Sequence, residues 1–254
     1  HLEELRWHLI RSFAALAILA VGAFFYRETL LDFYINAPLR ASFPINRLLC
    51  ALDIAGCIDI KVNMQAINPY ELFLKSISFS LTAGFIVGFP YIAWEIWRFI
   101  KPGLHPDEQK KLRGNVAIIS LLFFLGIAFS YYIILPFSIN FLATFPLMPD
   151  IKVEWRIGDT ISFVSQVILA GGIMFEMPIV VYYLASLGLI TPQFMRSYRR
   201  HAIVILLVAS AILTPPDVMS QILIFIPLSL LYEISIKICA VVTRRREKEI
   251  FTSE

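Results

Sequence analysis

Apolar residues in this chain gather into long runs, and the charged residues lie almost entirely between those runs. Six runs contain at most one charged residue each: 12–26, 76–94, 114–135, 160–189, 201–213 and 218–232. Crossing a hydrocarbon core of about 30 Å takes roughly 20 mostly apolar residues in a helix, and none of the runs alternates between apolar and polar residues as a strand would. The pattern therefore predicts six transmembrane helices.

We expect these helices to form one membrane domain that covers residues 1–254. The predicted spans are 8–27, 70–95, 113–135, 159–187, 198–213 and 218–238. External loops are expected at 28–69, 136–158 and 214–217, and cytoplasmic loops at 96–112 and 188–197. The fifth span has about 16 residues, or roughly 24 Å, which is shorter than the bilayer core. The fold class is therefore an all-α polytopic membrane protein, a concave bundle with short fifth and sixth spans.

Prolines are expected to bend several of these helices. Pro90, Pro178 and Pro227 fall inside predicted spans, where each one frees a backbone carbonyl and can kink its helix.

The overall composition agrees with a membrane protein. The chain is 58% hydrophobic and 16% charged, which is too apolar for a soluble domain of this length. Because the chain begins at His1 and not at methionine, we expect residues to precede it.

The positions of lysine and arginine predict the orientation. Fifteen of these residues flank the spans on the side of residues 96–112 and 188–197, and seven lie on the other side, in much longer loops. Cytoplasmic loops carry the excess of basic residues, so both termini are expected in the cytoplasm. Anionic lipid headgroups account for these basic residues, and the net charge of +3 gives no indication of nucleic-acid binding.

The cysteines leave one question open. Cys50 and Cys57 both fall in the first external loop, where they form either a disulfide or two unpaired small apolar residues. Three cysteines and four scattered histidines do not form a metal-binding pattern, so no metal or cofactor is expected.

Glu176 is the one charged residue deep inside a predicted span. A carboxylate at that depth costs about 2.5 kcal/mol or more on insertion scales, so it should face protein or water. It makes either a hydrogen bond to another span of the same bundle or a polar contact in a cavity or with the transmembrane helix of a partner.

Acidic and aromatic residues also stand at the predicted cytoplasmic ends of helices. On spacing alone, Glu3, Glu4 and Glu108 are ordinary acids in the first turn of a helix, where they complement its dipole. Trp97 and Phe99 are typical of the aromatic belt at a membrane surface.

Four motifs along the chain nevertheless resemble those of one family, TatC, the large membrane subunit of the twin-arginine (Sec-independent) protein translocase. They are residues 1–6, HLEELR; 97–104, WRFIKPGL, followed by Glu108; 175–178, FEMP; and 214–218, TPPDV, with Ser220 and Gln221. Their order and the number of spans agree with the family from end to end. His8 is a departure, because the family usually has arginine there.

The resemblance implies a receptor for signal peptides that carry consecutive arginines on folded export cargo, and one that nucleates the export complex. It implies that Glu4 and Glu108 accept the two guanidinium groups, with Phe99 and Arg6 shaping the site. Glu176 would contact a partner. Five further residues would have structural or interaction roles. One is Pro90, within the second span, and the others are the motif residues Trp97, Pro102, Asp217 and Gln221.

The same resemblance implies a place in the cytoplasmic (inner) membrane and several partners. They are single-span subunits of the TatA and TatB kind, the lipid bilayer, and further copies of the chain in a larger complex. Transport in the family is driven by the proton gradient, and the sequence has no Walker A pattern.

Two other classes of function compete with this one. The first is a secondary transporter or channel for a small solute that uses Glu176, but the sequence has no visible inverted repeat and only one deep acid. The second is an intramembrane enzyme, but the sequence has no HExxH motif and no nucleophile paired with a base. We therefore expect a binding protein and not an enzyme.

Overall fold

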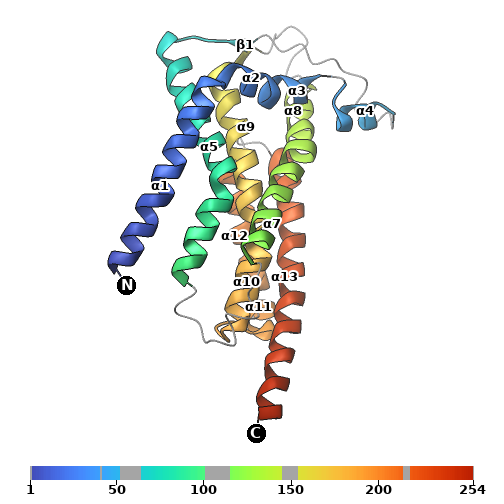
Figure 1. Cartoon of the computed structure of the whole chain (residues 1–254). Coiled ribbons are helices and arrows are strands. Elements are labelled where there is room, and N and C mark those ends of the chain that lie inside the picture. The colour runs from blue at the N-terminus through green and yellow to red at the C-terminus, as the bar shows by residue number, and fades with distance from the viewer. Residues whose placement is uncertain are drawn as a thin grey trace.

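The computed structural model describes residues 2–40, 42–51, 64–100, 115–144, 154–213 and 218–253. Within these ranges, five helical segments are long and apolar enough to cross a membrane. They are Glu3–Phe25, Tyr70–Phe99, Asn115–Ala143, Ile157–Ser186 and Gln221–Arg245. The chain is therefore a helical membrane protein, and the segments stand beside one another as a bundle (Figure 1).

Each span is built from one helix or from several consecutive helices. The first is α1 (Leu2–Phe25) and the second is α5 (Pro69–Ile100). The third consists of α7 (Asn115–Phe129), the π-helical turn η3 (Ser130–Ile134) and α8 (Leu135–Thr144). The fourth consists of α9 (Ile157–Met174) and α10 (Met177–Ser186), and α11 (Pro192–Ser197) follows it.

The last two helices differ in length more than expected. Helix α12 (Arg199–Leu213) has 15 residues, so the prediction of a short fifth span is confirmed. Helix α13 (Val218–Ser253) has 36 residues and continues well past residue 238, where the predicted sixth span ends, so the helix extends beyond the part expected to lie in the membrane. No glycine or proline follows residue 227, so nothing in the sequence ends this helix.

Buried apolar side chains hold the bundle together near the middle of the third and fourth spans. Phe123, Leu135, Val164 and Ile168 are almost completely inaccessible. The opposite faces of the helices are apolar too but exposed, and these faces suit contact with lipid.

The end of the bundle opposite the chain termini is capped by short elements. Helices α2 (Arg27–Leu31), α3 (Ala37–Leu39) and α4 (Pro44–Ala51) lie there with the π-helical turn η1 (Asp32–Asn36) (Figure 1). Strands β1 (Met64–Gln65) and β2 (Trp155–Arg156) form a parallel pair that joins the two long loops. An ion pair between Glu71 and Arg156, 3.3 Å from Oε2 to Nη2, ties α5 to the same region.

Both chain termini lie at the other end of the bundle (Figure 1). Helix α1 starts there and runs upward along α5, which descends antiparallel to it and ends at the same level. We call this end the termini end. It therefore brings the start of α1 and the end of α5 together.

Candidate functional site

A buried carboxylate joins α1 to α5 near the termini end. The side chain of Glu95 is only 1% exposed, and its Oε2 atom accepts a hydrogen bond from Nδ1 of His8 on α1. Its Oε1 atom accepts a second hydrogen bond, of 2.9 Å, from the hydroxyl of Tyr91 one turn earlier on α5. Both oxygens of Glu95 are therefore occupied within the protein.

This contact fixes how the two helices are aligned. Glu4 lies one helical turn before His8, and Phe99 lies one turn after Glu95. Because the helices are antiparallel, Glu4 and Phe99 come to the same height, one turn closer to the termini end. The rings of His8 and Phe99 also meet edge to face, with centroids 6.3 Å apart. The structure thus brings Glu4 and Phe99 to adjoining faces of the two helices.

The Glu4 side chain is exposed, whereas Phe99 is half-buried. Arg6 is exposed too, but at 100° per residue it projects from the side of α1 opposite to Glu4. Trp97 turns toward a different neighbour, because its ring lies 5.5 Å from that of Tyr183 on α10. The end of α5 therefore faces α1 through Phe99 and α10 through Trp97.

Several expected site residues fall outside the described part of the chain. Glu108, Pro102, Asp217 and Cys57 are among them. The Cys50 backbone belongs to α4, but nothing is described of its side chain, so the Cys50–Cys57 disulfide stays a prediction.

Glu176 lies at a break in the fourth span. Helix α9 ends at Met174 and α10 begins at Met177, because Pro178 has no N–H to continue the ladder of backbone hydrogen bonds. Oε1 of Glu176 is buried and has no hydrogen-bond partner among the described residues. The hydrogen bond to another span that we considered is therefore not formed by this atom within the described ranges.

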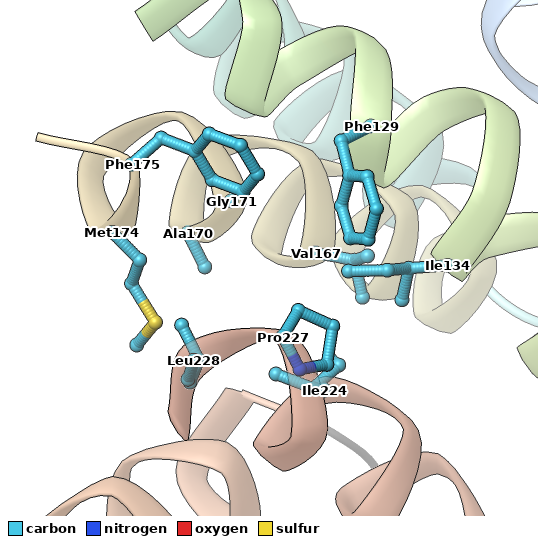
Figure 2. A pocket seen from close by; sticks show the side chains of 10 residues that line it. All are labelled: Phe129, Ile134, Val167, Ala170, Gly171, Met174, Phe175, Ile224, Pro227 and Leu228. Atoms are coloured by element: carbon cyan, nitrogen blue, oxygen red, sulfur yellow. The ribbon is translucent and has the colours of Figure 1, made fainter. Parts of the chain in front are cut away.

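A small pocket opens beside this break, between the third span, α9 and α13 (Figure 2). Its wall includes Gly171, Met174 and Phe175 on one side and the ring of Pro227 on the other. The ten lining residues shown in Figure 2 are all apolar, so the pocket offers no polar side chain to bind a charged or polar solute.

Gln221 connects two helices, and Pro90 lies within one helix. Gln221 donates from Nε2 to the backbone oxygen of Leu207 at 3.0 Å and so ties the start of α13 to α12. Pro90 lies inside α5, which continues on both sides of it. Among the residues that the structure describes, no group of three His, Cys, Asp or Glu side chains lies in a position to hold a metal ion.

The contact between His8 and Glu95 was not predicted from the sequence. Glu95 follows directly after the apolar run 76–94, as the last residue of the predicted span 70–95, and no role was predicted for it. His8 was noted only as a departure from a family pattern. The sequence did contain a signal for this contact. His8 lies one turn from Glu4 and Glu95 lies one turn from Phe99, and their two helices were expected to be antiparallel.

These features define a polytopic helical membrane protein that presents acidic and aromatic side chains where its first two spans meet. The family described as Sec-independent protein translocase protein (TatC) matches residues 1–227. The chain is 36% identical to the TatC protein of Aquifex aeolicus, with 98% of this chain and 96% of the relative covered. It is 34% identical to that of Blattabacterium sp. subsp. Periplaneta americana, with 97% and 96% covered.

Solved structures agree with these relatives. A crystal structure described as the twin arginine translocase receptor TatC superposes with a TM-score of 0.78 at 36% identity and covers 96% of this chain and 99% of the other. A second, described as the same receptor in DDM, gives a TM-score of 0.78 at 37% identity, with 93% and 97% covered. The chain therefore belongs to the TatC family. It is a subunit of the twin-arginine protein translocase, a membrane complex for protein transport, and it is not an enzyme.

Proposed function

We propose that this chain is the receptor that binds the twin-arginine signal peptide of folded precursor proteins and so nucleates assembly of the export complex. The observation that supports it most is the exposed carboxylate of Glu4, held at the height of Phe99 where α1 and α5 meet. A guanidinium group needs a planar acceptor with two oxygens, and a carboxylate provides one.

The second acceptor in this proposal is Glu108. It lies in the connection that follows α5, and α5 ends at the same end of the bundle as Glu4. Two carboxylates on that side would match the two consecutive arginines of the signal. Phe99 would form an apolar wall beside Glu4. Arg6, on the other side of α1, would meet the peptide or lipid headgroups away from Glu4.

The excess of basic residues beside the termini end supports a cytoplasmic position for it. In this proposal both termini, Glu4 and Glu108 face the cytoplasm, and the protein lies in the cytoplasmic membrane. A receptor on that side meets cargo before export.

A second contact in this proposal joins Glu176 to a partner subunit inside the membrane. Its buried Oε1 atom has no partner among the described residues, and an unpaired polar atom in an apolar environment is unfavourable. A polar side chain on the single span of a TatA- or TatB-like subunit would satisfy it. We propose this contact as one route by which the complex assembles.

Photocrosslinking in membranes tests the receptor function. A photoreactive group beside Glu4 should label a precursor with an Arg-Arg signal and not one with Lys-Lys. Glu108→Ala should abolish this arginine-dependent labelling while the protein still inserts. Equal labelling of both signals, or of wild type and Glu108→Ala, would contradict the proposal.

A further inference from the structure

The contact of α1 with α5 combines a polar network around one buried carboxylate with an otherwise apolar surface. None of the residues in the apolar window of α1 is buried within the protein, and side chains such as Phe13 and Ile18 are exposed. Its principal neighbour among the described elements is α5. Further along this contact, Gly84 of α5 lies against the backbone of Ala20, where an added Cβ would come within 2.7 Å of the Ala20 nitrogen, so close packing also favours one alignment of the two helices there.

The polar network acts nearer the termini end, and it too forms at one alignment only. Glu95 receives hydrogen bonds from His8 and Tyr91, and a shift of α1 by one residue would move His8 by 1.5 Å along the axis and 100° around it. That shift would leave a buried carboxylate without one of its partners, which is costly in an apolar environment. Each of the two paired residues is followed by an arginine about one turn later. Arg11 lies on the same side of α1 as His8, and Arg98 comes three residues after Glu95 on α5.

We infer that the network of His8, Glu95 and Tyr91 is a register lock that holds α1 on α5 so that Glu4 stands level with Phe99. Glu95 is thereby a positioning residue of the signal-peptide site. Its function in binding rests on the proposed function above, whereas its role in aligning the two helices does not.

A direct contact of Glu95 with the arginines does not fit the geometry. Its side chain is 1% exposed, and both of its oxygens are already hydrogen-bonded. Glu4, one turn away from the lock on α1, is exposed instead. The buried acid therefore aligns the helices, and the exposed acid is the one that the peptide can reach.

Disulfide crosslinking without any peptide tests the lock itself. The full chain would be placed in membranes with its three native cysteines replaced by alanine. One cysteine pair, Glu4→Cys with Phe99→Cys, reports the alignment near the lock. The control pair, Phe24→Cys with Phe73→Cys, reports the far end of the same two helices, where the native rings lie 6.4 Å apart.

Glu95→Leu should lower the rate of crosslinking of the first pair by about 3- to 30-fold, the range expected for hydrogen bonds between membrane helices. The control pair should crosslink as before. His8→Phe should give the same result from the other side of the contact, and it decides the question if Glu95→Leu fails to insert. Unchanged crosslinking at Glu4 and Phe99 in both variants would overturn the lock.

Peptide binding by matched variants of Glu95 then separates positioning from direct contact. Glu95→Gln keeps the shape and one acceptor oxygen for His8, and its NH2 group can donate to the hydroxyl oxygen of Tyr91, but the charge is lost. It should retain the crosslink and bind an Arg-Arg signal within about twofold of wild type, whereas Glu95→Leu should lose affinity by about 3- to 30-fold. A Glu95→Gln variant that keeps the crosslink and loses arginine-dependent binding would show direct contact and overturn positioning.

Failure of the proposed function gives a distinct result. In that case wild type would show no preference for Arg-Arg over Lys-Lys signals. Loss of the crosslink in Glu95→Leu would still support the lock as an alignment device, but the positioning role in peptide binding would be overturned.

Discussion

Gly126 and Gly171 bring the backbones of α7 and α9 into direct contact. A Cβ atom added to Gly126 would lie 2.5 Å from the carbonyl oxygen of Gly171 and 2.8 Å from Cβ of Phe175. Small residues let membrane helices approach this closely, and much of the attraction between such helices comes from close packing. The contact lies beside the break that carries Glu176, so it also supports that part of the proposed partner site.

Gly126→Ala should therefore destabilise the protein. The atoms that the new methyl group meets belong partly to backbone, which cannot rotate away, so the helices must separate. We expect a loss of about 1–3 kcal/mol, as for other overpacked interiors. Thermal unfolding of the purified protein in detergent measures this as a lower midpoint temperature.

Gly22→Ala is the matched control for that change. Gly22 also lies within a membrane helix, but a Cβ there would meet nothing within 4 Å. Alanine is the better helix former, so the midpoint should stay the same or rise slightly. An equal loss of stability in the two variants would mean that the close contact between Gly126 and Gly171 is not the cause.

Glu4→Gln should weaken binding of an Arg-Arg signal peptide by tenfold or more, because a hydrogen bond to a charged group contributes about 1.5–3 kcal/mol. Affinity for a fluorescent signal peptide, measured with the protein in nanodiscs, tests this. The peptide with Lys-Lys should bind weakly to both forms.

Glu3→Gln is the control for Glu4→Gln. Glu3 is exposed and has the same charge, but it is rotated by about 100° around α1 from Glu4. The Glu3→Gln variant should bind the Arg-Arg peptide almost as well as wild type does. An equal loss in Glu3→Gln would point to the general negative charge of the helix start and not to one positioned acceptor.

The sequence was sufficient to predict most of the fold because hydrophobic runs in membranes carry a strong signal. A run of about 20 apolar residues has few alternatives to a spanning helix. The length of α13 was missed since its apolar run ends near Tyr232 while its helix continues through charged residues to Ser253. Hydropathy marks where a helix leaves the membrane, and only a breaker or a tertiary contact marks where it stops.

The site was predictable only in part. Glu4 and Phe99 were recognised by resemblance, but their alignment depends on Glu95 and His8, which lie 87 positions apart in sequence. Periodicity places each of these residues on a face of its own helix. It does not say which faces meet, because that depends on the packing of whole helices.

Glu176→Gln should leave insertion and signal binding unchanged but impair assembly of the complex and transport. Glutamine keeps a polar side chain of the same size, so the fold should tolerate it, but a contact that needs a carboxylate would be lost. Co-purification of the small subunits, together with a transport assay in membrane vesicles, measures the effect. Full transport by this variant would return Glu176 to a structural role.

Tyr183→Phe provides a comparison for Glu176→Gln. Its hydroxyl is another buried polar atom without a hydrogen-bond partner among the described residues, and it lies two turns further along the same span. We expect near-normal assembly in this variant. If both variants impair assembly to the same extent, loss of any polar atom in the region would explain the effect and Glu176 would have no special role.

Gln221→Leu should loosen the attachment of α12 to α13. The Nε2 group of Gln221 donates to the backbone oxygen of Leu207, 14 positions earlier, and α12 is too short to span the bilayer core on its own. Hydrogen bonds between membrane helices average about 0.6 kcal/mol and reach about 1.7 kcal/mol, so we expect a loss of stability within that range. Thermal unfolding measures it, and Gln166→Leu is the control, since Gln166 is exposed on α9.

Because a short helix depends on its neighbour to hold its depth in the membrane, Gln221→Leu should also make α12 more accessible from outside the membrane. A cysteine placed at Val208, on the exposed face of α12, should react faster with an impermeant thiol reagent. Unchanged stability and labelling would mean that apolar packing alone holds α12 in place.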